Sequence, residues 1–124
     1  MGDSVEREGQ IKETEEVRTA KIIFSLIIPQ GRKVQEKMTL RPAVDYRLKG
    51  VVDANIEEAL TKRSKRGQAR QKVIAATDEV KRLGIAIDEI GDACRIGETI
   101  GRYLKRNKGA RYEFERLPID LSTL

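Results

Sequence analysis

Histidine and tryptophan are absent from this chain of 124 residues, and cysteine occurs once, as Cys94. A single thiol cannot form an internal disulfide, which favours a reducing compartment. The lack of histidine removes the commonest general base and the commonest metal ligand. No apolar run approaches the length of a membrane span, and the acidic N-terminus does not resemble a secretory signal. We therefore expect a cytoplasmic protein, or one associated with a nucleoid or chromatin, with no cofactor, small-molecule substrate or membrane contact.

Charge is abundant in this sequence and unevenly distributed along it. Residues 1–16 contain six acidic and two basic residues, a net charge of −4. Residues 17–124 contain 23 basic and 14 acidic residues, a net charge of +9. We interpret residues 1–17 as a flexible acidic arm and residues 18–124 as a single domain, because this length supports one hydrophobic core. A basic domain favours polyanionic partners, which include DNA and RNA.

Two segments in the first half of the chain predict β-strands. Residues 20–28 carry apolar side chains on both faces, which indicates an inner strand. A second strand is expected after Pro42, where alternate positions up to Leu48 are apolar or aromatic. Residues 30–37 would connect the two strands as part of a hairpin.

Three helices are expected after these strands. Asp53 or Asn55 would cap a short helix that precedes the basic stretch at 61–72. Apolar residues at spacings of three and four then predict a second helix, for which Gly84 is the stop. These apolar residues are Ala69, Val73, Ala76, Val80 and Leu83. A third helix is expected over about residues 92–107.

Two further strands are expected, over residues 85–90 and 111–117. The resulting order favours an α/β fold, a small two-layer sandwich in which two main helices pack on a mixed sheet. The helix at 92–107 contains Gly97 and Gly101, each of which costs about 1 kcal/mol relative to alanine. This cost indicates the close approach of a neighbouring surface. The protein's own sheet is the favoured candidate, and a partner helix or a sugar-phosphate chain are the alternatives.

Two runs of basic residues contain no acidic residue, and we call them basic segment 1 (62–72) and basic segment 2 (102–111). Their cations are Lys62, Arg63, Lys65, Arg66, Arg70 and Lys72 in the first, and Arg102, Lys105, Arg106, Lys108 and Arg111 in the second. Cations in segment 1 precede a helix and meet the positive end of its dipole, a conflict that a bound phosphate would resolve. Cations in segment 2 lie at a helix C-terminus, where the dipole favours them anyway. A solvated charged turn is the alternative for both segments.

Other functions are indicated by fewer residues. The chain would be a structural subunit of a ribonucleoprotein or virion if the apolar strand at 20–28 mediated assembly. In a third interpretation, Asp88, Glu89 and Asp92 would bind Mg²⁺ in an enzyme, although acidic residues are favoured near a helix N-terminus without a metal. Cys94 has no neighbouring base and is interpreted as a buried structural thiol.

The second half of the chain contains a series of short motifs in a fixed order. They are Lys65-Arg66, Val73-Ile74-Ala75-Ala76, Gly84, the strand at 85–90, Gly91-Asp92-Ala93, Leu104-Lys105-Arg106 and the strand at 112–117. Together, residues 65–117 resemble the Alba family of archaeal and eukaryotic DNA- and RNA-binding proteins. The resemblance implies an Alba-like fold or a rearranged variant, and a homodimer that binds duplex nucleic acid with little sequence preference. It also implies that Lys65 and Arg66 contact the backbone and that Gly91 lies near the dimer and ligand face.

We therefore predict a nucleic-acid-binding protein without enzymatic activity. Basic segments 1 and 2 would contact the phosphate backbone of DNA or RNA with little sequence specificity. This prediction requires the two segments to converge on one surface of the molecule.

Overall fold

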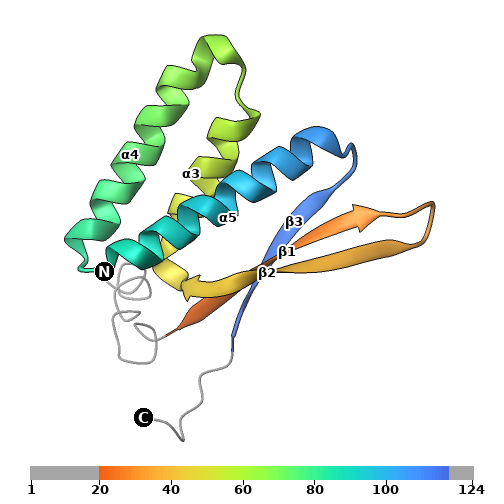
Figure 1. Ribbon diagram of the computed structural model, residues 1–124, viewed down its shortest axis with the longest axis horizontal. Coiled ribbons are helices and arrows are strands. Elements are labelled where there is room, and N and C mark those ends of the chain that lie inside the picture. The colour runs from red at the N-terminus through yellow and green to blue at the C-terminus, as the bar shows by residue number, and fades with distance from the viewer. Residues whose placement is uncertain (1–19, 118–124) are drawn as a thin grey trace, which may run out of the picture.

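The computed structural model describes residues 20–117 and shows an α/β fold (Figure 1). Its elements are β1 (Lys21–Pro29), β2 (Gln35–Asp45), the 3₁₀ turn η2 (Tyr46–Leu48), α3 (Lys49–Leu60), the 3₁₀ turn η3 (Arg63–Lys65), α4 (Arg66–Arg82), α5 (Ile87–Arg106) and β3 (Arg111–Arg116). The proposed acidic arm at 1–17 lies outside the described residues. None of the helices described has an apolar stretch long enough to cross a bilayer.

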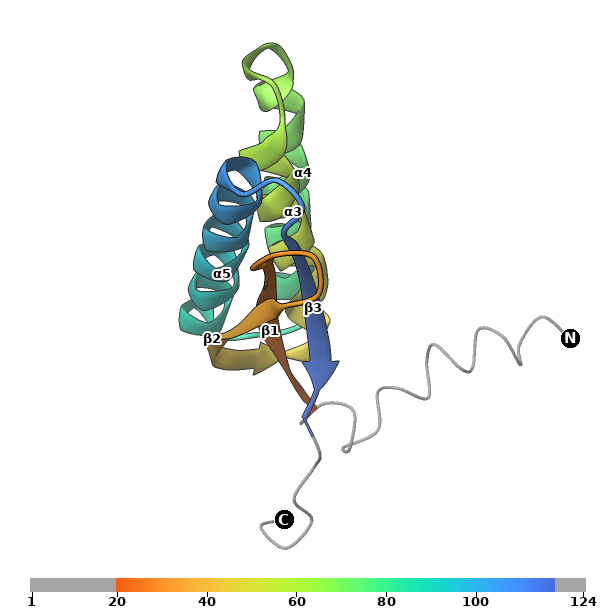
Figure 2. The same cartoon turned by 90° about the vertical axis from the view of Figure 1, so that its right-hand side faces the viewer.

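The sheet has three strands in the described part of the chain, and all of its pairings are antiparallel. The prediction of a mixed sheet is therefore wrong, because residues 20–117 form no parallel pair, whereas the three helices expected from the sequence are present. The α/β class itself is confirmed. The helices form one layer beside the sheet, and α4 packs mainly against α3 (Figures 1 and 2).

β1 is the inner strand of the sheet, as its two apolar faces predict, with β2 on one side and β3 on the other. Ile22, Phe24 and Leu26 face the helices and belong to the hydrophobic core. Ile23 and Ile27, on the opposite face, are also buried. Because both edges of β1 are paired and its apolar side chains are covered, this strand does not offer the assembly surface considered for it.

β2 begins earlier than predicted, at Gln35 rather than after Pro42. Its antiparallel register places Met38 and Leu40 opposite β1, where both pack against the core. Lys37, Thr39 and Arg41 alternate with these two residues and are exposed. Polar and charged residues therefore outnumber the apolar ones along this part of the strand. The strand ends at Asp45, and the last residues of the predicted strand form the turn η2 instead.

α3 also begins earlier than predicted, so neither Asp53 nor Asn55 caps it. Asp53 lies one turn into the helix and forms an ion pair with Lys49, with 2.7 Å between Oδ2 and Nζ. Asn55 is buried, and its side-chain amide donates a 2.8 Å hydrogen bond to the carbonyl of Val51. Both polar side chains therefore have an ion-pair or hydrogen-bond partner within α3.

Residues 85–90 do not form the predicted strand, because α5 begins at Ile87. Gly84 ends α4 in the predicted manner, with a φ of 83° that an L side chain rarely adopts. Ile90, Ala93, Ile96 and Ile100 are buried at spacings of three and four, so burial from Ile90 onward follows the helical period rather than alternation. One of the motifs that carry the Alba resemblance is therefore helical.

α5 crosses α3 at close range through two glycines. A Cβ added at Gly97 would lie 2.5 Å from the Cβ of Asn55 and 2.6 Å from the carbonyl oxygen of Val52. A Cβ added at Gly101 would overlap the Cβ of Ala59. The surface that approaches these glycines is therefore helix α3, and the expectation that it would be the sheet is wrong.

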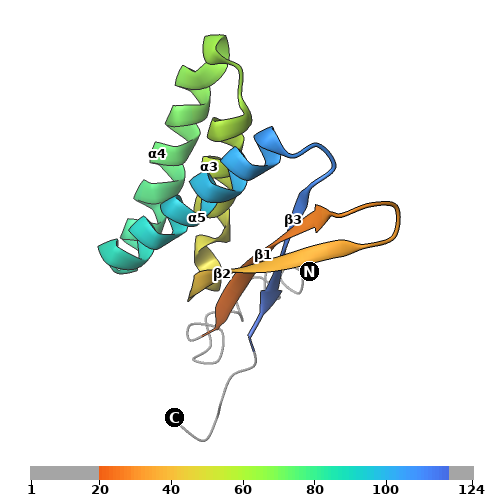
Figure 3. The same ribbon diagram turned by 45° about the vertical axis from the view of Figure 1, so that its right-hand side comes forward.

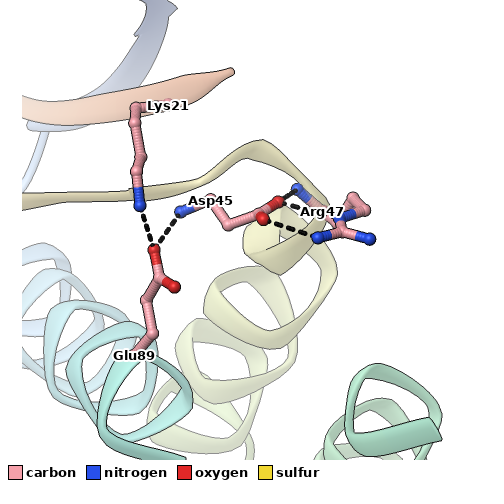
Figure 4. Close-up of polar contacts among 4 residues, drawn as sticks. All are labelled: Lys21, Asp45, Arg47 and Glu89. Carbon is pink, nitrogen blue, oxygen red and sulfur yellow. Dashed lines mark hydrogen bonds and ion pairs between the residues drawn. The ribbon is translucent and has the colours of Figure 1, made fainter. Parts of the chain in front are cut away.

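A polar network fixes the start of α5 to the sheet (Figure 4). The Glu89 carboxylate accepts a 2.5 Å bond from Lys21 Nζ and a 3.0 Å bond from the backbone N–H of Asp45. The buried Asp45 carboxylate in turn accepts bonds of 2.8 and 3.1 Å from the guanidinium of Arg47. These contacts link β1, the end of β2 and η2 to the N-terminal turn of α5.

Substitution of Gly97 by alanine tests the contact between α3 and α5. We expect Gly97→Ala to lower the free energy of unfolding by about 1–3 kcal/mol, because the added Cβ overlaps the backbone of α3. Gly91→Ala is the matched control, since no atom lies within 4 Å of its added Cβ. Helix propensity predicts that this control raises stability by up to about 1 kcal/mol. Urea denaturation followed by circular dichroism measures both; equal effects would contradict the close contact.

Tyr112 on β3 provides a test in alkaline solution. Its hydroxyl donates a 2.9 Å hydrogen bond to Asp53 Oδ1. Burial, then this bond and the charge of Asp53, raise the pKa of Tyr112 to about 12 from 10.0. The folded chain therefore keeps a proton that the unfolded chain loses, and we expect this contribution to stability to be constant below about pH 10 and to be lost as pH rises toward 12.

Absorbance titration of tyrosine ionisation measures this shift. We expect Tyr112→Phe to remove an ionisation whose pKa is about 12. A titration curve that loses an ordinary transition near pH 10 instead would contradict the raised pKa.

Candidate nucleic-acid interface

Basic segment 1 occupies the turn between α3 and α4 together with the first turns of α4, and all six of its cations are exposed. α4 begins at Arg66, and its N-cap residue, Lys65, makes no side-chain capping hydrogen bond. The first turn of α4 contains no acidic residue. The predicted conflict between clustered cations and the positive end of the helix dipole is therefore present in the structure.

Basic segment 2 extends from the C-terminal part of α5 through the following loop to the first residue of β3. All five of its cations are exposed. Lys105 and Arg106 lie in the last turn of α5, where the helix dipole favours positive charge. The geometry of this segment is consistent with both structural stabilisation and ligand binding.

The two basic segments meet at one cleft. The α3–α4 turn and the C-terminal half of α5 lie on the same side of the helical layer (Figures 1 and 3). A cleft of about 340 Å³ between them is lined by Asn55, Glu58, Ala59, Arg66, Glu98 and Arg102. Arg66 belongs to segment 1 and Arg102 to segment 2, so a member of each run contributes to the same concave surface.

The cleft continues as a groove between α4 and α5. A second cavity of about 290 Å³ shares Asn55 and Glu98 with the first. Its remaining lining residues are Arg70, Val73, Ile74, Thr77, Asp78, Lys81 and Cys94. Cys94 is half-buried, so the expectation of a buried structural thiol is wrong in this respect.

Two cations of segment 1 are engaged by carboxylates of α3. Arg70 pairs with Glu58 at 3.4 Å, and Lys72 pairs with Glu57 at 2.9 Å. The other nine cations of the two segments make no ion pair with any residue between 20 and 117. These nine are therefore the more available to a polyanion.

The residues that sequence reasoning missed are Glu58 and Glu98, which place negative charge in the cleft itself. A search for basic runs does not find acidic residues on neighbouring helices. One signal was present in the sequence: Glu57 and Glu58 precede the turn, and Arg70 and Lys72 follow it. Opposite charges on the two sides of a turn indicate a helical hairpin with ion pairs between its arms.

The three carboxylates considered as an Mg²⁺ site do not converge. Glu89 binds Lys21 and the backbone of Asp45, whereas Asp92 forms an ion pair with Arg95 one turn along α5. Across residues 20–117, no group of three or more metal-binding side chains is close enough to hold an ion. The structure therefore gives no geometric support to the metal-dependent interpretation.

A double-mutant cycle between Arg70 and Glu58 tests whether segment 1 is held rigidly by ion pairs. Because the Arg70 side chain is 56% exposed, we expect a coupling energy of about 0.2–1 kcal/mol in denaturation experiments. Arg63→Ala serves as the control, with an expected change within about 0.5 kcal/mol, since Arg63 pairs with no described carboxylate. A coupling energy above about 2 kcal/mol would show that these cations serve the fold.

Comparison of this chain with protein-family models, curated proteins and solved structures finds no match. The resemblance to the Alba family therefore stays a prediction.

Proposed function

We propose that this protein binds nucleic acid by its phosphate backbone, at the side of the helical layer where basic segments 1 and 2 meet. The observation that carries the proposal is the shared cleft of Arg66 and Arg102. These residues come from different helices, both are exposed, and neither pairs with a carboxylate of the described chain. Two unpaired guanidinium groups at one concave surface suit the phosphates of a nucleic-acid backbone, because each guanidinium can donate two hydrogen bonds to one phosphate.

The distribution of charge around the cleft favours an extended polyanion over a single small anion. Nine unpaired cations extend from the α3–α4 turn to the start of β3, a wider surface than one phosphate occupies. Neutralising several phosphates releases condensed counterions, which drives binding and makes it depend on salt. Glu98 lines the cleft and disfavours a phosphate deep inside it. We therefore place the phosphates along the basic rim.

The proposed contact recognises the backbone rather than the bases. Tyr103 is the only aromatic residue within the two segments, and it is half-buried. Binding of single strands usually uses exposed rings on which bases stack. A rim of lysine and arginine without such rings fits recognition of phosphates, with little sequence preference.

Charge reversal at the start of α4 tests the site. We expect the double variant Lys65→Glu and Arg66→Glu to weaken binding about tenfold or more for every sequence tested, because phosphate contacts become repulsive. The plot of log affinity against log salt should also become shallower by about two. Fluorescence anisotropy with duplex DNA, duplex RNA and single strands at two salt concentrations measures both effects.

The matched control reverses Lys33 and Arg82, which are exposed and line neither the cleft nor the groove. This double variant changes the net charge by the same amount. We expect it to lose much less affinity than the Lys65 and Arg66 variant. Equal losses would show that only net charge matters, and unchanged binding by the Lys65 and Arg66 variant would contradict the proposed site.

A further inference from the structure

β3 forms an edge of the sheet, and among the described residues no strand pairs with its outer side (Figure 2). The backbone N–H of Leu117 bonds to the carbonyl of Lys21, so alternate residues of β3 direct their backbone groups toward β1. By this alternation, the backbone groups of Tyr112, Phe114 and Arg116 point outward. An edge strand with unpaired N–H and C=O groups is a template for pairing with another strand.

The two edges of the sheet differ in how they are protected. β2 contains Pro42, which has no N–H to donate, and its register with β1 is interrupted by an irregularity. β3 contains neither proline nor glycine, and its six residues pair with β1 in continuous register. Natural edge strands usually carry such interruptions to prevent association. β3 is protected instead by four charged side chains, so pairing there requires a partner whose charges complement them.

We propose that β3 pairs with β3 of a second copy of this chain, antiparallel and about a two-fold axis through Glu113. In this register Arg111 faces Glu115 of the second copy, and Tyr112 faces Phe114 of the second copy. The symmetry repeats each pair, which gives two ion pairs and two aromatic pairs. The outward backbone groups of Tyr112 and Phe114 would complete the hydrogen-bonded positions of the new ladder.

Side-chain positions on β3 support this register. Phe114 is 45% exposed although it lies on the face that meets the helices, so pairing would cover apolar surface. Glu113 would face its own copy at the axis, where like charges repel. Lys37 Nζ lies 3.6 Å from the Glu113 carboxylate and offsets that repulsion in each copy.

The neighbouring two-fold register is less favourable. An axis through Phe114 would place Glu113 opposite Glu115 of the second copy, twice, and would leave Arg111 without a carboxylate. Like charges directly opposite one another destabilise a strand pair. The order of charges along β3 therefore disfavours this axis. An axis through Tyr112 would place Arg111 opposite Glu113 twice, but it would pair β3 with Gly109 and Ala110, which lie outside the strand.

Charge exchange between Arg111 and Glu115 tests the interface. The measured quantity is the molecular mass of the protein in solution, without nucleic acid. Sedimentation equilibrium of the full chain, from micromolar to millimolar concentration, is expected to show a monomer–dimer equilibrium. We expect Arg111→Glu and Glu115→Arg each to raise the dimer dissociation constant about tenfold or more, because each places two like-charge pairs in the interface. The double variant restores both pairs with exchanged signs, and its dissociation constant should return to within about threefold of the original.

Two further variants make the test specific. Glu79→Arg changes an exposed charge on α4, and we expect it to leave the dissociation constant unchanged. In a Cys94→Ser background, Glu113→Cys should form a disulfide between copies under oxidising conditions, because residues facing across the axis have Cα atoms about 4.5 Å apart.

A chain that stays monomeric at all concentrations overturns the proposal. So does a dimer that Arg111→Glu and Glu115→Arg leave unchanged, or one that Glu115→Arg strengthens, which would indicate the axis through Phe114. Because the measured quantity is mass, failure of the dimer would leave the proposed nucleic-acid contact to be judged by its own experiment.

Discussion

The close crossing of α5 over α3 is the packing constraint on which the candidate interface depends. Gly97 and Gly101 let the α5 backbone approach α3 to a distance that a Cβ would prevent. Arg102 follows directly in the sequence, and α4 is attached to the far end of α3 through the basic turn. Because α5 lies against α3 at this distance, Arg102 reaches the cleft that Arg66 lines. A wider separation of the helices would separate the two basic segments as well.

Electrostatics assigns different roles to cations that look equivalent in the sequence. Arg70 and Lys72 form exposed ion pairs with carboxylates of α3 across the helical hairpin. Lys105 and Arg106 complement the dipole of α5. Lys65 and Arg66 oppose the dipole of α4 without a capping side chain, so they have the weakest structural reason for their positions. Among the cations of the two segments, those at the start of α4 are therefore the ones whose positions an anionic partner best accounts for.

The two faces of β1 are buried and stabilise the sheet, whereas β3 has an outer edge that no described strand pairs with. β1 is buried on both faces and paired on both edges, which accounts for its continuous run of apolar residues. On the face away from the helices, Lys37 reaches from β2 to Glu113 and Glu115 on β3. The two glutamates of β3 are thus part of an existing ion-pair cluster. Backbone recognition of a polyanion and pairing of edge strands would share Arg111, and otherwise use separate residues of one small domain.

The sequence alone determined the elements whose pattern is local: β1 by its apolar run, α4 by its stripe and Gly84, β3 by alternation, and the two basic segments by composition. It failed at residues 85–90, where the apolar spacing fits a strand and a helix equally well. The burial of Ile90 in one stripe with Ala93 and Ile96 decides for the helix, and that burial comes from packing against distant elements.

The sequence also hid the first half of β2, since an edge strand with one exposed face has few apolar residues. Only the tertiary structure could place Arg66 beside Arg102, because their proximity comes from a contact between helices rather than from their spacing along the chain.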